Sequence, residues 1–442
     1  MATIADDARA GGPASIVRSF KHRNYRLFFS GQVISLVGTW MQSVAQAWLV
    51  YRLTGSAFWL GAVGFAGQIP VLFVSPFAGT FADRHARRSI LVATQTIAMV
   101  LALALGAFTL LVDLHPAHIL AFALALGVVN AFDIPARQAF IPEIVAPGDL
   151  VNAIALNSSM VHLGRLVGPA LAAFVVAAVG EGWCFILNGL SFIGVVAALL
   201  AMRLSPKPRP PRHQSALQSM REGIAYAAGH PGIRALLLLV AFVSITAMPF
   251  AVLLPVFADK ILGGGPDTLG ALMSASGGGA FVCAMVLASR SRAKGLGRWI
   301  AIASFVLGVS LLAFAWASST WLAASALVLT GGAMLTMMSG SNTLIQALVP
   351  DALRGRVMSV FVMMFLGTAP IGALAAGWTA EHIGAPITVT VGAICSLFAG
   401  AVFAWRLPSV RARSELLVSQ QMVGGEPAAA ISTPPPAPVA GG

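Results

Sequence analysis

Long apolar runs separated by short polar segments dominate the pattern of this sequence. Each run reaches about twenty residues or more, the length that an α-helix needs to cross the hydrocarbon core of a bilayer. The pattern therefore predicts an all-α integral membrane protein with twelve membrane-spanning helices. The expected helices cover residues 26–51, 57–82, 89–112, 117–140, 150–179, 183–204, 233–260, 268–289, 298–317, 320–346, 356–381 and 385–406.

One longer polar segment interrupts this alternation in the middle of the chain. It begins with a proline-rich stretch, and proline removes a backbone donor and breaks helices. The residues that follow, Gln214 to Ala228, suit a short amphipathic helix on the membrane surface. The segment predicts a linker between two bundles of six helices. The expected division is an N-terminal tail at 1–25, an N-terminal bundle at 26–204, the linker at 205–232, a C-terminal bundle at 233–407 and a disordered tail at 408–442.

Two similar stretches indicate that the bundles are related by an internal repeat. Residues 147–153 precede a helix in the first half, and residues 350–356 precede one in the second half. Both helices carry glycine and proline near their middle. Repeats of this kind build many secondary transporters, in which the substrate site lies between the halves near the membrane midplane. We therefore expect two pseudo-symmetric bundles.

Composition and charge refine this picture. The chain is 58% hydrophobic and only 10% charged, whereas about a quarter of the residues in soluble domains are charged. The formal net charge of +12 comes from short basic clusters between the apolar runs, not from one patch, which argues against nucleic-acid binding. Nearly all Lys and Arg fall on the side of the two termini; Arg52 and Lys260 fall on the other side, and Arg165 lies within the membrane. The positive-inside rule then predicts a multi-pass membrane protein with both termini in the cytoplasm.

Four stretches resemble known motifs. Gly79-Thr-Phe-Ala-Asp-Arg-His-Ala-Arg-Arg88 resembles motif A of the major facilitator superfamily, with Ala86 where that family has glycine. Gly164-Arg-Leu-Val-Gly-Pro169 is similar to motif C, which is associated with exporters, although alanines replace its last two glycines. Residues 38–56 and 135–145 resemble the branch with macrolide-efflux-like and enterobactin-exporter-like proteins. The resemblance implies the major facilitator fold.

The basic hairpin has two interpretations. Gly79 and Asp83 are four residues apart and share one helix face, where glycine allows a neighbouring helix to approach closely. In the family this motif latches the two halves together on the cytoplasmic side, and the spacing favours that role over a pure topology signal. The equivalent hairpin in the second half lacks the aspartate, so we expect an asymmetric latch. The expected latch residues are Gly79, Asp83, Arg84, Arg87 and Arg88, and the motif C residues are Gly164, Gly168 and Pro169.

Ionisable residues inside membrane-spanning helices are functional candidates by default. Asp133 and Arg137 lie four residues apart near the cytoplasmic end of their helix. Three roles stay open: the two residues pair with each other, Asp133 joins Arg84 or Arg87 in a charge relay, or Asp133 carries an exchanged proton. The structural pairing is the favoured role.

Arg165 lies near the membrane midplane, with His162 three residues earlier on the same helix face. A lone arginine at this depth is costly, so it should face a partner or the space between the halves. We expect it to contact an anionic or polar part of a substrate; a hydrogen bond to Gln42 or Gln46 is the alternative. These amides and the neighbouring Trp40 suit an amphiphilic ligand.

The pattern predicts a transporter, and the resemblance implies a secondary active one of the bacterial inner membrane. It implies most specifically an exporter of amphiphilic small molecules of drug, macrolide or siderophore type that works by alternating access and antiports protons. The first helix lacks the acidic residue that some proton-coupled exporters of the family carry. An importer of the same fold and a sensor or scaffold that transports nothing are the alternatives. We expect no enzymatic activity, metal, cofactor or nucleic-acid partner. The expected partners are the substrate, protons and the lipid bilayer, and we expect a monomer.

Overall fold

The computed structural model describes residues 18–204, 216–288 and 295–423, and every regular element within these ranges is a helix. Twelve spans are long and apolar enough to cross a membrane, which confirms the predicted all-α membrane fold. The spans of the N-terminal half are α3 (Arg23–Thr54), α4 (Ala57–Arg84), α5 (Arg87–Leu111), α6 (Pro116–Ile144), α7 (Leu150–Val179) and α8 (Glu181–Ala201).

The C-terminal half forms its six spans from more pieces. Two of its spans are interrupted, the first by a 3₁₀ turn and a π-turn and the fifth by a π-turn. Prolines lie at or beside these interruptions, where they remove backbone donors. The pieces are α10 (Pro231–Thr246), η4 (Met248–Leu253), α11 (Leu254–Val256), η5 (Phe257–Ile261), α12 (Pro266–Ala288), α13 (Leu296–Ala315), α14 (Thr320–Leu348), α15 (Asp351–Val362), η6 (Met363–Gly367), α16 (Ala369–Ile383) and α17 (Ala385–Val423).

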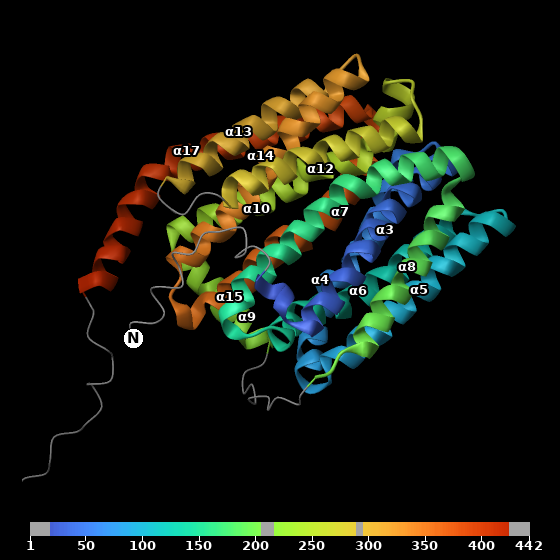
Figure 1. The fold of residues 1–442 in the computed structure, drawn as a ribbon. Helices are drawn as coiled ribbons and strands as arrows, with labels where there is room; N and C mark the ends of the chain where they lie inside the picture. The colour runs from blue at the N-terminus through green and yellow to red at the C-terminus, as the bar shows by residue number, and fades with distance from the viewer. Residues whose placement is uncertain (1–17, 205–215, 289–294, 424–442) are drawn as a thin grey trace, which may run out of the picture.

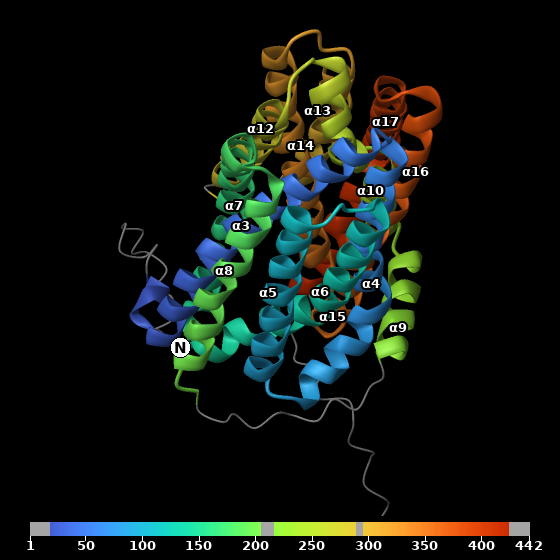
Figure 2. The same cartoon turned by 90° about the vertical axis from the view of Figure 1, so that its right-hand side faces the viewer.

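Figures 1 and 2 show the helices of the N-terminal half, blue to green, beside the yellow-to-red helices of the C-terminal half. Because the number of spans is even, both described ends of the chain lie at the same end of the bundle, which we call the terminal face. The other end, which carries the α3–α4 turn at Gly55, is the opposite face. The halves meet along two helix pairs, α4 with α16 and α7 with α12.

A short helical turn, η2 (Arg18–Lys21), anchors the start of the described chain to the terminal face. The carboxylate of Asp149, in η3 (Pro147–Asp149), is almost fully buried and lies 2.7–2.8 Å from Arg18, Lys21 and His22. Ser19 adds hydrogen bonds to Asn152. One buried carboxylate therefore ties the first described residues to the loop before α7.

The linker contains a helix, α9 (Ala216–Gly229), over most of the stretch predicted to be helical, and it packs against α15 of the C-terminal half. Glu222 forms an ion pair with Arg356, and Gly223 lies so close to the backbone of Arg356 that a Cβ there would sit 2.6 Å from its carbonyl oxygen. The rest of the linker, 205–215, lies outside the described residues. In Figure 1, α9 lies beside α15 near the terminal face.

The C-terminal end of the chain differs from expectation. The sequence predicts disorder from residue 408, but α17 continues as a helix to Val423. Between Pro408 and Gly424 the sequence contains neither glycine nor proline, so nothing in it interrupts a helix. Residues 424–442 lie outside the described part of the chain.

Candidate functional site

The arginines of the motif A hairpin bind to helices of their own half. Arg87 pairs with Glu143 of α6 at 2.7 Å and also donates to the carbonyl oxygen of Ala139. Arg88 donates to the carbonyl oxygen of Leu200 in α8 at 2.6 Å. Arg84 is exposed at the end of α4. Gly79 and Asp83 lie in the last turns of the same helix, and the side chain of Asp83 is outside the described residues.

Asp133 is buried in a polar network that joins three helices of the N-terminal half. Its carboxylate pairs with Arg137, one turn further along α6. The same carboxylate accepts hydrogen bonds from the Thr94 hydroxyl at 2.9 Å and the Gln95 amide at 2.8 Å, both in α5. Arg137 in turn donates to Gln32 of α3 at 3.2 Å. Of the roles left open by the sequence, this geometry supports the pairing with Arg137, and Arg87 pairs elsewhere.

Changing Asp133 to asparagine should destabilise the protein by about 3 kcal/mol, because breaking a buried ion pair leaves Arg137 without its counter-charge. The measurement is the midpoint of thermal unfolding in detergent. Asp133→Asn combined with Arg137→Gln should cost less than the sum of the two single changes, since each single change removes the same pair. Strictly additive effects would contradict the structural pairing.

The motif C glycines allow α7 to approach α3 closely. A Cβ on Gly168 would lie 2.5 Å from the Cβ of Trp40, and one on Gly164 would lie 3.1 Å from the Trp40 ring. On its other side α7 contacts α12 of the C-terminal half, where a Cβ on Gly270 would lie 2.7 Å from the carbonyl oxygen of Pro169. Motif C therefore places α7 directly between α3 and the other half of the molecule.

Arg165 lies at the α7–α12 contact between the two halves. Its carbonyl oxygen would be 2.6 Å from a Cβ on Gly277 of α12, and its guanidinium lies over the ring of Trp40 at 5.7 Å from the ring centre. Within the described residues, the partly buried Arg165 side chain has no hydrogen bond or ion pair. A guanidinium at this depth that has an aromatic face beside it and no ion pair among the described residues can bind an anionic or polar ligand group.

The other expected ligand residues have different surroundings. His162 is partly buried, and its Nδ1 atom is buried without a partner among the described residues. Gln42 accepts a hydrogen bond from the Asn188 amide of α8 at 2.7 Å, so it is engaged away from Arg165. Gln46 is partly buried. The structure places Arg165 beside Trp40, and among the described residues no hydrogen bond joins it to Gln42 or Gln46, the alternative considered from the sequence.

Several polar partners went unrecognised in the sequence: Glu143, Thr94, Gln95 and Asn188. Thr94, Gln95 and Asn188 are polar residues inside apolar runs, and Glu143 follows directly after one, which is the one signal that marks such positions. The partner of each of these residues lies on another helix, so spacing along the chain does not reveal the pairs.

Twelve membrane-spanning helices in two halves, with a partly buried cation at their contact, form the architecture of a major facilitator transporter. A family model described as "Transmembrane secretion effector" matches residues 14–433. The chain belongs to this family.

Curated relatives are similar along nearly their whole length. The staphyloferrin A transporter of Staphylococcus aureus is 24% identical over 86% of this chain and 95% of its own. The multidrug efflux pump Tap of Mycolicibacterium fortuitum is 25% identical over 85% and 93%. Macrolide efflux protein A of Streptococcus pyogenes is 25% identical over 82% and 92%. These relatives confirm the predicted superfamily and branch.

Solved structures support the same fold. The nucleoside transporter NupG superposes with a TM-score of 0.68 at 15% identity, covering 87% of this chain and 98% of its own. A bacterial homologue of ferroportin in an inward-facing state superposes with a TM-score of 0.65 at 16% identity, covering 86% and 98%. At this identity the likeness concerns the fold alone.

Proposed function

We propose that this transporter exports amphiphilic small molecules that carry an anionic or strongly polar group. The observation that carries the proposal is Arg165, a cation at the contact between the halves whose described neighbour is the face of Trp40. An aromatic wall beside an available cation suits a ligand with apolar and charged parts. The names of the relatives, a staphyloferrin A transporter and two efflux proteins, support a small-molecule substrate, and the two efflux proteins support the outward direction.

We infer that the terminal face lies in the cytoplasm of a bacterial cell and that the protein works as a monomer in the inner membrane. The basic residues that the sequence collects on this face support the orientation. The two halves touch through α4 with α16 and through α7 with α12, and the α4–α16 contact reaches the opposite face. In the proposed cycle, substrate enters from the terminal face and leaves through the opposite face.

The motif A hairpin is proposed to latch the terminal face when the opposite face opens. Gly79 and Asp83 would contact the other half in that state, while Arg87 and Arg88 hold the hairpin to α6 and α8 of its own half. Those two bonds support the proposal, because a latch works only if the hairpin is rigidly attached to the half that carries it.

Exchange with protons is the proposed energy source. Asp133 is a buried carboxylate, but its pairing with Arg137 favours a structural role. The test of proton exchange is therefore to collapse the proton gradient and measure whether export stops.

The experiment is a panel of siderophores, macrolides and other amphiphilic compounds in a strain that lacks its own exporters. Expression should lower the accumulation of at least one anionic or polar amphiphile, and a protonophore should abolish the effect. Higher accumulation on expression would instead identify an importer. If no compound changes, the export proposal fails.

A further inference from the structure

A set of polar contacts joins the two halves at the rim of the opposite face. The carboxylate of Glu381, near the end of α16, accepts hydrogen bonds from three donors at the start of α4 in the other half. These donors are the Ser56 hydroxyl at 3.0 Å, the Ala57 amide at 2.7 Å and the Phe58 amide at 3.2 Å. One side chain thus caps a helix more than three hundred residues away in the sequence.

This cap replaces one that α4 lacks locally. The Ser56 side chain, at the N-cap position, makes no capping hydrogen bond of its own. The first amides of a helix have no partner within the helix, and its N-terminus favours a negative charge. Glu381 supplies both the acceptor and the charge. Separation of the halves on this face would leave these amides to water and remove the carboxylate from the helix end.

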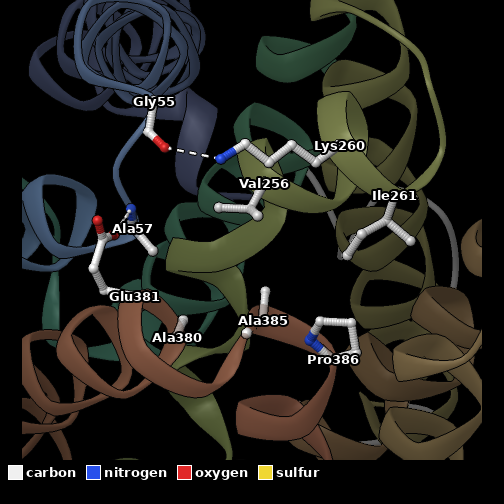
Figure 3. A pocket seen from close by; sticks show the side chains of 10 residues that line it. Gly55, Ala57, Val256, Lys260, Ile261, Ala380, Glu381, Ala385 and Pro386 are labelled. Atoms are coloured by element: carbon white, nitrogen blue, oxygen red, sulfur yellow. Dashed lines mark hydrogen bonds between the residues drawn. The ribbon is translucent and has the colours of Figure 1, made fainter.

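Lys260 makes a second contact across the same rim. Its ammonium group, from η5 of the C-terminal half, donates to the carbonyl oxygen of Gly55 at 3.1 Å and lies 5.8 Å from the centre of the Tyr51 ring. Figure 3 shows Lys260 reaching Gly55 from one side while Glu381 reaches Ala57 from the other. The two side chains therefore bind the short α3–α4 turn and the start of α4 from two sides.

The space between these contacts is not filled by side chains. A cavity of about 280 Å³ lies at the rim, lined by Glu381, Lys260 and small or aliphatic residues such as Ala380 and Val256. Beside this cavity α4 and α16 pack closely. A Cβ on Gly377 would lie 2.7 Å from the carbonyl oxygen of Ala57, and one turn further along α4 a Cβ on Gly61 would lie 2.6 Å from the carbonyl oxygen of Ala373. At the rim, the polar contacts of Glu381 and Lys260 therefore lie beside both an unfilled space and a close helix contact.

We propose that Glu381 and Lys260 form a clamp that keeps the opposite face closed, and that its release is required for the transporter to open there. Both side chains belong to the C-terminal half, and the described hydrogen bonds of both are made to the N-terminal half. Motion of one half against the other therefore breaks the contacts together. The inference uses the transport function and is independent of substrate and direction.

Distances between spin labels across the opposite face test the clamp. The three native cysteines are replaced by alanine, and labels are attached at Asp113→Cys in the N-terminal half and Ser318→Cys in the C-terminal half; both positions are exposed. The full-length protein is measured in lipid nanodiscs without substrate or ion gradient. Failure of the export proposal therefore leaves this result unaffected.

Glu381→Gln keeps the shape of the side chain but removes the charge. It should raise the ratio of long to short distances by roughly fivefold or more, because a charged acceptor of three hydrogen bonds becomes a neutral amide. Lys260→Gln should shift the ratio in the same direction. Ser56→Ala, which removes only one donor, should produce a smaller shift and serves if the other variants do not fold.

Asp267→Asn is the matched control. Asp267, like Glu381, is an exposed carboxylate on this face and lies at a helix start. That helix is α12, which belongs to the same half as Asp267, so Asp267 does not join the two halves. Its replacement should leave the distances unchanged. An unchanged distribution in Glu381→Gln and Glu381→Ala would overturn the clamp, as would an equal shift in Asp267→Asn.

Discussion

Arg165→Ala is expected to lower the export of anionic amphiphiles by about tenfold or more, since a hydrogen-bonded charge in a desolvated site contributes at least that much to binding. Export of a neutral compound by the same variant should change much less. The measurement is efflux from preloaded cells at several substrate concentrations. The loss should appear mainly as a higher half-saturating concentration.

The stability of the same variant separates this role from a structural one. Because Arg165 has no ion pair among the described residues, its removal leaves no buried counter-charge behind. It also removes the cost of holding a cation within the membrane. The thermal midpoint should therefore stay equal or rise. A lower midpoint together with an equal loss for all substrates would show that Arg165 serves the fold.

Two further variants complete the comparison. Arg165→Lys keeps the charge but loses the planar donor geometry, so it should retain part of the export of anionic compounds. Arg298→Ala removes an exposed arginine at the start of α13 and should leave export unchanged. Full export activity in Arg165→Ala would contradict the proposed role of Arg165 in binding the substrate.

A large loss of stability from helix packing is expected for Gly279→Ala. At this position α12 packs against α14 within the C-terminal half, and an added Cβ would lie 1.8 Å from the carbonyl oxygen of Val328. Backbone atoms do not rotate away as a side chain does, so the two helices must move apart. We expect a loss of about 3 kcal/mol, at the upper end of the range for overpacked cores.

The neighbouring glycine provides the control. A Cβ on Gly278 would meet only the Leu166 side chain at 3.5 Å, an ordinary contact. Gly278→Ala should therefore fold and melt like the parent protein, while Gly279→Ala should give less folded protein and a lower thermal midpoint. On the facing side of α14, a Cβ on Gly331 would lie 1.9 Å from the carbonyl oxygen of Ser276. Gly331→Ala should therefore lower the thermal midpoint as Gly279→Ala does. Equal midpoints for Gly278→Ala and Gly279→Ala would contradict this packing.

The helices themselves were predictable because a single physical rule governs them. In a bilayer every backbone polar group needs an internal partner, so each long apolar run must form a helix. The breaks inside two spans of the C-terminal half were not predicted. Proline marks such positions, but whether a span bends, forms a π-turn or stays regular depends on the helices that pack around it.

The candidate site was predictable in part. Arg165 and Asp133 stand out as charges within apolar runs, and that signal is local. Their partners were not predictable, since Trp40 and Thr94 lie on other helices. Glu381 shows the limit most clearly. In the sequence it is one acidic residue near a helix end, and only the packing of the halves makes it the cap of α4.

The sequence by itself determined the membrane fold, the number of spans, the expected orientation and the superfamily, because hydrophobic length, charge bias and short motifs are local properties of the chain. The tertiary structure alone decided which polar groups pair, which glycines lie against a backbone, and where the two halves are joined. These depend on side chains that meet from helices distant in the sequence, and no spacing along one helix specifies them.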